Sequence, residues 1–258
     1  MKQCVKCLTV ETADTIVFGT DGVCSVCRQI EKKLTAVDWG FRRVELDAIV
    51  AAAKARNHTW DAIIGFSGGK DSTWQAFFAT KVLGLRVLLV RFNHWSYRPG
   101  NEENNIRTLK ALSCEMIDYK PSWRVVKEMM KEGLLRRGDQ CIFCHSGVSC
   151  IPMHMAVKFN IPLILHGESL AEYQSFGYDF SGKEEWDSVR FNRAINLGLT
   201  ADDFWAFIKD RGIDKRDLWP FTFPAQKELN DVGVRAICLG DYIKWNTRAQ
   251  VDQIKADL

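Results

Sequence analysis

Residues 67–72, SGGKDS, place two glycines, two serines, a lysine and an aspartate directly after the apolar run 62–64. In a turn between a strand and a helix, glycines let the backbone approach a ligand, and the free N–H groups of the helix start attract anions. The Lys70 ammonium and the hydroxyl groups of Ser67 and Ser72 can donate to phosphate oxygens. A carboxylate beside phosphates needs a divalent cation between them, so Asp71 is interpreted as a Mg²⁺ ligand. The predicted phosphate contacts are Ser67, Gly68, Gly69, Lys70, Asp71 and Ser72.

This segment differs from the Walker A motif, GxxxxGK[ST], because Lys70 is followed by Asp71 and only two glycines are adjacent. The alternative interpretation is a glycine-rich turn that carries a solvent-exposed lysine. The strand pattern before the turn and the helix pattern after it favour phosphate binding.

The first 27 residues hold two pairs of cysteines, Cys4-x-x-Cys7 and Cys24-x-x-Cys27, separated by sixteen residues. Each CxxC pair supplies two thiolates, and a structural zinc site needs four. This spacing predicts a zinc ribbon in which the metal substitutes for a hydrophobic core. A redox pair or disulfides are the alternatives.

A second set of cysteines is Cys141, Cys144 and Cys238. Cys141 and Cys144 precede an apparent helix, and Cys238 ends the last predicted strand. These points can converge at the carboxyl edge of a doubly wound sheet, where three thiolates suit an iron–sulfur cluster with one open iron. Alternatively, the first two are a thiol pair and Cys238 belongs to the core. We interpret Cys114 and Cys150 as core thiols.

Polar residues follow two further predicted strands. Glu168 comes directly after the strand that ends at His166-Gly167, and Glu172 lies one helical turn further on. Glu168 is a candidate Mg²⁺ ligand or substrate contact, with a solvated carboxylate as the alternative. After the strand ending at Phe92, the loop supplies candidate nucleotide contacts: Asn93, His94, Asn104 and Asn105.

The elements that must position these residues alternate along the chain. Apolar periodicity predicts a helix over 44–57 and then a series of strands and helices. The strands are expected over 61–66, 85–92, 115–119, 161–167 and 234–240, and the helices over 71–84, 102–113, 122–137, 151–160, 201–212 and 248–258. This order predicts an α/β fold with a doubly wound, mostly parallel sheet. Residues 173–219 are less regular and read as an insertion or lid.

Composition narrows the class of protein. The chain has 258 residues, 47% of them apolar, and a net charge of +3, so it lacks the strongly basic character of a dedicated nucleic-acid binder. No apolar run reaches the ~18 residues that a membrane helix needs. The start, MKQCVKC, has no apolar signal-peptide core, so we expect a cytoplasmic protein. Nine cysteines in that compartment favour metal or redox roles.

The SGGKDS segment resembles the PP-loop of the N-type ATP pyrophosphatases, which cleave ATP between its α- and β-phosphates. The resemblance implies that a substrate oxygen attacks the α-phosphate, that AMP activates the substrate, and that a nucleophile then displaces AMP. It also implies catalysis by Lys70, Asp71 and Mg²⁺, with Glu168 as a further catalytic candidate.

The order of the cysteine pairs, SGGKDS, CIFCHSG, HGES and CLGDYIKWN resembles the N-acetyl sugar amidotransferase family of bacterial surface-polysaccharide biosynthesis, over nearly the whole chain. The resemblance implies that ATP and ammonia convert an acetamido group of a nucleotide-linked sugar to an acetamidino group, with ammonia from a partner glutaminase pair. It divides the chain into a zinc ribbon, 1–35, and a PP-loop domain, 36–258, whose C-terminal part is expected to be missing or naturally short.

Two other functions stand beside this one. The Cys141, Cys144 and Cys238 layout is similar to that of PP-loop tRNA thiolation enzymes with a 4Fe–4S cluster. Weak basicity and the lack of an evident RNA-binding appendage beyond the ribbon argue against that function. A zinc-dependent scaffold with a decayed nucleotide site is disfavoured because SGGKDS is intact.

Overall fold

The computed structural model describes residues 2–11, 16–167 and 188–258. Its centre is a five-stranded sheet with the order β3-β2-β1-β4-β5, and every neighbouring pair is parallel. The predicted α/β fold class is therefore confirmed. The strands are β1 (Ala62–Gly65), β2 (Val87–Phe92), β3 (Glu115–Tyr119), β4 (Leu163–His166) and β5 (Arg235–Cys238).

The central strands are apolar on both faces because helices cover both sides of the sheet. Ile63 and Ile64 on β1 are fully buried and point to opposite sides, into two separate hydrophobic clusters. Continuous apolar strands of this kind are typical of a parallel sheet between two helical layers.

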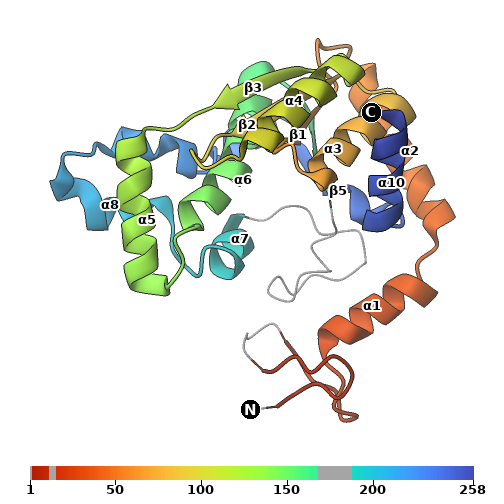
Figure 1. Cartoon of the computed structure of the whole chain (residues 1–258), viewed down its shortest axis with the longest axis horizontal. Coiled ribbons are helices and arrows are strands. Elements are labelled where there is room, and N and C mark those ends of the chain that lie inside the picture. Colours follow the sequence, from red (N-terminus) through yellow and green to blue (C-terminus); the bar gives the residue numbers. More distant parts are fainter. Residues whose placement is uncertain (1, 12–15, 168–187) are drawn as a thin grey trace.

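Two sets of helices form these layers (Figure 1). One face of the sheet packs with α2 (Trp39–Ala55), α3 (Lys70–Phe77), α4 (Pro99–Leu112) and α10 (Thr247–Asp257). The other packs with α5 (Trp123–Arg137), α6 (Ile142–Phe159), α8 (Ala201–Ile208) and α9 (Gln226–Val232). The sheet is thus doubly wound, as predicted.

The strand order places the SGGKDS segment beside the point where the order of the strands reverses. From β1 the chain moves to β2 and β3 on one side and then crosses to β4 and β5 on the other. Open α/β sheets bind ligands outside the carboxyl ends of the strands where the order reverses in this way. Residues 66–69 follow β1, one of the two strands that border this switch point.

The N-terminal segment lies beside these layers. Figure 1 shows residues 2–11 and 16–24 apart from the sheet, joined through α1 (Ser25–Thr35) to α2. The sequence did not predict α1, nor the short helices α7 (Ser188–Ala194) and α9 (Gln226–Val232). α7 and α9 have seven residues each, too few to give a clear helical period. In α1, by contrast, Val26, Ile30 and Leu34 recur every four residues, a signal that could have indicated the helix.

The start of α6 corrects the predicted helix 151–160. The helix begins at Ile142, nine residues earlier, and Pro152 lies inside it. Proline is favoured at the first turn of a helix and disfavoured within one, so the sequence reads as a helix that starts near Pro152. As a consequence, Cys144 lies in the first turn of α6 and not in a loop before it.

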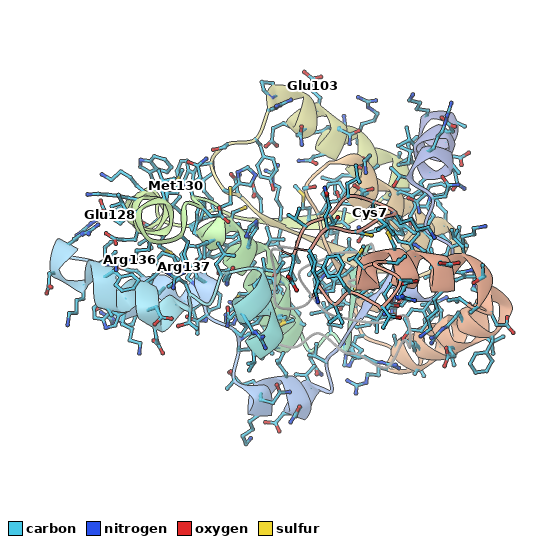
Figure 2. The ribbon with its side chains drawn as sticks, turned by 90° about the horizontal axis from the view of Figure 1, so that it is seen from below. Cys7, Glu103, Glu128, Met130, Arg136 and Arg137 are labelled. Carbon is cyan, nitrogen blue, oxygen red and sulfur yellow. The ribbon has the colours of Figure 1, made fainter. Side chains whose placement is uncertain are left out.

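On the face opposite to α2, a group of charged residues joins α5 to the segment after α8. The buried Glu132 accepts from Arg136, at 2.9 Å, and from Arg211, which also pairs with Glu128. Figure 2 labels Glu128 and Arg136 on α5. Burial opposes ionisation of Glu132, but hydrogen bonds from Arg211 and Arg136 outweigh it and lower the pKa of its carboxyl. These pairs hold α5 against the Lys209–Arg211 turn.

Within the described ranges, every helix is too short or too polar to cross a membrane.

Candidate functional site

The SGGKDS turn folds back on the first turn of α3. Gly68 has φ +76°, a backbone conformation that favours glycine. The backbone N–H and the hydroxyl group of Ser67 both lie 3.2 Å from Ser72 Oγ. Ser72 Oγ in turn donates to the Gly69 carbonyl oxygen at 3.2 Å. The turn is therefore held in place by its own two serines.

The start of α3 presents unpaired backbone donors. Its N-cap is Gly69, which has no side chain to accept from the first turn. In the described part of the chain, no acceptor is recorded for the N–H groups of Lys70, Asp71 and Ser72. The first N–H groups of a helix have no intrahelical partner and carry its positive dipole end. This turn therefore has the donors that bind a phosphate group.

Lys70 and Asp71 form an ion pair with each other. Lys70 Nζ lies 2.6 Å from both carboxylate oxygens of Asp71, and the two side chains are 50% and 33% exposed. A Mg²⁺ ion fits an accessible carboxylate at this place, because Mg²⁺ is held by one or two carboxylates together with phosphate oxygens. Binding of metal and phosphate here requires this exposed pair to separate, which costs little.

Asparagines of α4 hold the same turn from the side of β2. Asn104 Nδ2 donates to the Gly68 carbonyl oxygen at 2.6 Å and to Thr73 Oγ1 at 3.1 Å. Asn101 Nδ2 lies 3.5 Å from the Ser67 carbonyl oxygen. Asn105 is 1% exposed and faces Gly68: a Cβ atom on Gly68 would lie 2.0 Å from Asn105 Oδ1. The structure thus brings Asn104 and Asn105, both singled out in the sequence, to the phosphate-binding turn.

The buried Arg91 near the end of β2 holds the start of α4. Its guanidinium donates to both carboxylate oxygens of Glu102, at 2.8 Å, and to Asp118, its neighbour in register on β3. Burial opposes ionisation of Asp118, but hydrogen bonds from Arg91 and Asn93 lower the pKa of its carboxyl. Sequence analysis missed this group, although Arg91 is a charged residue within the apolar run 87–92.

The predicted contacts Asn93 and His94 have other protein partners in the structure. Asn93 is buried, its Nδ2 donates to Asp118 at 3.1 Å, and its Oδ1 accepts from the Trp95 N–H at 3.1 Å. His94 packs against Tyr97, with ring centroids 4.2 Å apart, and burial lowers the pKa of its imidazole. Both residues shape the loop after β2.

The end of β4 meets α3 and the end of β5. The Gly240 N–H donates to the Gly167 carbonyl oxygen at 2.8 Å, and a Cβ atom on Gly167 would lie 2.3 Å from Gln75 Nε2. Burial lowers the pKa of His166 to about 4, so its imidazole is neutral at pH 7. The predicted Glu168 and Glu172 lie outside the described residues.

The three cysteines predicted to converge do not form one group. Cys144 lies beside Cys141 and near Tyr97, at the end of β2, whereas Cys238 ends β5. Two strands stand between β2 and β5, and three strand spacings of about 4.8 Å amount to roughly 14 Å. Among the described residues, one group of three or more His, Cys, Asp or Glu side chains lies at metal-ligand spacing. It consists of the four N-terminal cysteines.

Those four cysteines have the geometry of a closed metal site. The ligand atoms of Cys4, Cys7, Cys24 and Cys27 all lie within 4.8 Å of one another. Cys4 Sγ is 3.9 Å from Cys27 Sγ, and Cys7 Sγ is 3.7 Å from Cys24 Sγ. Thiolates about 2.3 Å from a tetrahedral Zn²⁺ have sulfur–sulfur distances of about 3.8 Å. Figure 2 labels Cys7 in this segment.

Backbone donors favour the thiolate form of Cys4. The N–H groups of Lys6 and Cys24 point to Cys4 Sγ at 3.4 and 3.3 Å. Burial opposes ionisation of Cys4, but the backbone donors outweigh it and lower the pKa of its thiol to about 6. Burial instead raises the pKa of the Cys24 and Cys27 thiols of the same group. It likewise raises the pKa of Cys114 and Cys150, as expected for inert thiols packed against the core.

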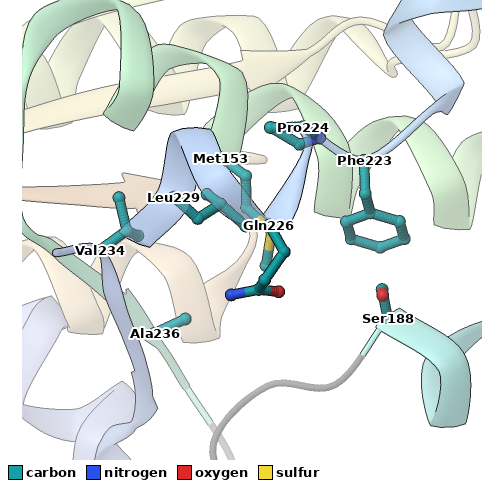
Figure 3. Close-up of a pocket in the computed structure, with 8 residues that line it drawn as sticks. All are labelled: Met153, Ser188, Phe223, Pro224, Gln226, Leu229, Val234 and Ala236. Atoms are coloured by element: carbon teal, nitrogen blue, oxygen red, sulfur yellow. The ribbon is translucent and has the colours of Figure 1, made fainter. Parts of the chain in front are cut away.

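Two cavities lie away from the phosphate-binding turn. One, of about 150 Å³, is bounded by α6, α9 and β5 (Figure 3) and is lined by Met153, Ser188, Phe223, Pro224, Gln226, Leu229, Val234 and Ala236. The other, of about 450 Å³, opens at the amino edge of the sheet near Trp60, Arg86 and Cys114. Neither includes a residue of the SGGKDS segment.

Comparison with curated proteins finds partial relatives. The chain is 31% identical over 85 residues to the glutamine-hydrolysing GMP synthase of Pyrobaculum aerophilum, covering 33% of this chain and 17% of that protein. It is 24% identical over 155 residues to an uncharacterized protein of Methanocaldococcus jannaschii, covering 59% of this chain and 55% of that protein. The chain therefore spans about a sixth and about half of the lengths of these relatives. No family model matches the chain.

Comparison with solved structures finds distant similarity to synthetases. The ammonia-dependent NAD synthetase of Campylobacter jejuni aligns with 77% of this chain and 94% of its own, at 15% identity and TM-score 0.39. The NMN synthetase of Francisella tularensis aligns with 76% and 93%, at 12% identity and TM-score 0.37. The NAD⁺ synthetase of Burkholderia pseudomallei aligns with 96% of each chain, at 11% identity and TM-score 0.38. The fold assignment rests on the strand order of the chain itself.

Proposed function

We propose that this chain is an ATP-dependent amidotransferase that forms AMP and pyrophosphate and converts an acetamido group of a nucleotide-linked sugar to an acetamidino group. One observation carries the proposal: the SGGKDS turn lies next to the switch point of a parallel sheet, with the unpaired N–H groups of α3 beside Lys70 and Asp71. The partial relative named as a glutamine-hydrolysing GMP synthase supports transfer of ammonia. The resemblance of the ordered motifs supports the sugar substrate.

The proposed reaction has two steps. The amide oxygen of the acetamido group attacks the α-phosphorus of ATP, the bond from that phosphorus to the β-phosphate oxygen breaks, and pyrophosphate leaves. The product is an O-adenylyl imidate. The amide oxygen, a poor leaving group in the acetamido group, can now leave as part of AMP. The lone pair of ammonia then attacks the imidate carbon, the carbon–oxygen bond breaks, and AMP leaves to give an amidinium group.

The chain's residues serve this reaction through position and charge. The N–H groups of Lys70, Asp71 and Ser72 hold the β- and γ-phosphates, and the Lys70 ammonium neutralises charge on the departing pyrophosphate. Asp71 would hold a Mg²⁺ ion, which when bound neutralises phosphate charge. Glu168 follows β4 in the sequence, two residues after its end at His166, and is proposed as a further contact to metal or substrate.

The proposal includes partners and metals. A separate glutaminase supplies the ammonia, and a zinc ion held by Cys4, Cys7, Cys24 and Cys27 supports the N-terminal segment. The reaction takes place in the cytoplasm. The tRNA thiolation alternative depends on a three-cysteine cluster, and the separation of Cys238 from Cys141 and Cys144 gives it no support.

Substrate-dependent AMP formation tests the proposal. The protein is incubated with ATP, Mg²⁺ and ammonium and, in parallel, with acetamido UDP-sugars or with tRNA. We expect an acetamido UDP-sugar to drive AMP formation and its product to replace an oxygen by NH, which lowers the mass by about one unit. AMP formation that depends on tRNA would contradict the proposed substrate class. Failure of every acetamido UDP-sugar to stimulate AMP formation would also contradict it.

A further inference from the structure

A buried amide group lies next to the phosphate-binding turn. Asn105 on α4 is 1% exposed, and within the described residues neither its Nδ2 nor its Oδ1 has a hydrogen-bond partner. Buried polar side-chain atoms are nearly always paired, because an unpaired donor or acceptor loses its hydration without compensation. The two unpaired atoms of Asn105 therefore destabilise the fold in the absence of a ligand.

The position of this amide connects it to the turn. A Cβ atom on Gly68 would lie 2.0 Å from Asn105 Oδ1 and 2.9 Å from the carbonyl oxygen of Asn101. Gly68 is the residue of the turn with φ +76°. The neighbouring Asn104, whose amide donates to the Gly68 carbonyl oxygen and to Thr73, already supports the turn from the same helix. Asn105 is thus packed against the turn without being needed to hold it in this arrangement.

Rotation about the Cβ–Cγ bond exchanges the two ends of the amide. Either the NH₂ group or the carbonyl oxygen can then face Gly68, since protein partners for either orientation are absent from the described residues. An NH₂ group beside a phosphate-binding turn suits a phosphate oxygen, or a backbone carbonyl that turns when phosphate binds. A carbonyl oxygen there suits a backbone N–H of the turn.

We propose that Asn105 is a positioning residue for the triphosphate. Its amide acquires its hydrogen bonds only when the turn at residues 67–72 holds the phosphates, so it favours the phosphate-bound arrangement of the turn. The inference rests on the proposed binding of ATP at this turn. The chemical group that completes the site is the polyphosphate, shared by ATP and inorganic pyrophosphate, and not the adenosine.

The test separates this role from a structural one. Asn105→Leu, which keeps the branching at Cγ, is larger and has no polar atoms, is compared with the wild type in thermal unfolding without nucleotide and in calorimetric titration with Mg²⁺–ATP and Mg²⁺–pyrophosphate. We expect the melting temperature without nucleotide to stay the same or rise. We expect both ligands to bind about 10- to 100-fold more weakly, which corresponds to the loss of a hydrogen bond to a charged group.

Matched variants on the same helix complete the experiment. Ile106→Ala changes an exposed residue of α4, next to Asn105 in the sequence, and should bind both ligands like the wild type. Asn104→Ala loses two hydrogen bonds of the folded turn and should lower the melting temperature without nucleotide. Asn105→Ala provides a second variant if leucine prevents folding, with the same weakening of binding expected.

Each outcome has a defined meaning. If the wild type and Asn105→Leu bind ATP equally well, the role proposed for Asn105 is wrong, whereas the proposed ATP site is supported. A lower melting temperature without nucleotide, with unchanged affinity, would make Asn105 a structural residue. Weaker ATP binding with unchanged pyrophosphate binding would contradict the assignment to the polyphosphate. If the wild type binds neither ligand, the proposed function itself fails.

Discussion

Gly68 shows how closely the phosphate-binding turn depends on a single residue. Its φ of +76° disfavours any residue with a Cβ atom, and the space into which a Cβ would point is filled by Asn105 Oδ1 and the Asn101 carbonyl oxygen. The left-handed conformation costs a non-glycine residue roughly 1–2 kcal/mol, and overpacking costs roughly 1–3 kcal/mol more. Glycine is therefore required here by the backbone and by the neighbouring helix together.

We predict that Gly68→Ala lowers the free energy of unfolding by roughly 2–5 kcal/mol, the sum of these two costs. It should also weaken Mg²⁺–ATP binding, because the turn must move away from α4. Denaturant unfolding and calorimetric titration measure the two effects. Gly100→Ala is the control, since a Cβ there meets nothing within 4 Å and the residue lies at the start of α4. Equal stability of the two variants would show that the turn tolerates a side chain.

At this scale the sequence predicts residue types well and contacts between distant residues poorly. SGGKDS, the four N-terminal cysteines and the α4 asparagines are visible because their chemistry depends on local spacing. The contact of Asn105 with Gly68 joins residues 37 positions apart and depends on how α4 packs beside α3. The ion pair of Lys70 with Asp71 is likewise a property of the folded turn, since both side chains were predicted to face phosphate or metal.

A buried arginine connects strands β2 and β3 to helix α4. Arg91 is 5% exposed and joins Asp118 on β3 to Glu102 on α4, whose following residues support the phosphate-binding turn. Because the Arg91 guanidinium is buried, removal of either carboxylate partner leaves its positive charge only partly neutralised. We therefore expect this group to fix the position of α4 and, through it, of the turn.

Asp118 gives this group a pH dependence. The pKa of its carboxyl in the folded protein is below the ordinary value of 3.8, because hydrogen bonds from Arg91 and Asn93 outweigh the effect of burial. A carboxyl whose pKa is lowered in the folded protein stabilises the fold at pH values above its ordinary pKa. This stabilisation is lost as the pH falls through the pKa of the folded protein.

We predict that Asp118→Asn lowers the free energy of unfolding at pH 7 by about 1–2 kcal/mol. This figure is the usual contribution of hydrogen bonds to a charged group, reduced because the Asp118 side chain is partly exposed to solvent. The difference from the wild type should shrink as the pH falls below about 4. Urea unfolding between pH 7 and pH 3 measures both proteins. A constant difference over this range would mean that ionised Asp118 does not support the fold.

The elements were predicted more reliably than their exact ends and arrangement. The central strands β1, β2 and β4 were found because apolar runs of four to eight residues between turn residues are typical of buried parallel strands. The edge strands β3 and β5, which are partly exposed, were also predicted. The start of α6 was missed because Pro152 resembles a first-turn proline. The predicted convergence of Cys238 with Cys141 and Cys144 was not found, because strand order is not visible in one sequence. Cys141 and Cys144 lie at the start of α6 near the end of β2, and β1 and β4 lie between β2 and β5.

At the scale of the whole molecule, the chain combines a doubly wound sheet with a cysteine-rich N-terminal segment. The sheet has two large hydrophobic clusters, whereas the N-terminal cluster consists mainly of cysteines with Ile16 and a few partly buried residues. A segment with so small a core needs a metal or disulfides to fold. The tetrahedral sulfur spacing favours a metal.

We predict one zinc ion per chain by elemental analysis and loss of that zinc in Cys4→Ser. The folding of residues 2–35 should depend on the metal, so chelation should increase proteolysis in this segment and leave the sheet intact. Cys114→Ser is the control, because its thiol lies outside the cysteine group. Full zinc content in Cys4→Ser, or iron in place of zinc, would contradict the assignment.

The central claim is that a triphosphate lies in the turn at residues 67–72 with its α-phosphorus open to attack. The most direct measurement separates the products of ATP turnover in the presence of ammonium and an acetamido UDP-sugar, for the wild type and Asp71→Ala. The account predicts equal amounts of AMP and pyrophosphate from the wild type and neither from Asp71→Ala. Formation of ADP and phosphate, or undiminished AMP release by Asp71→Ala, would contradict it.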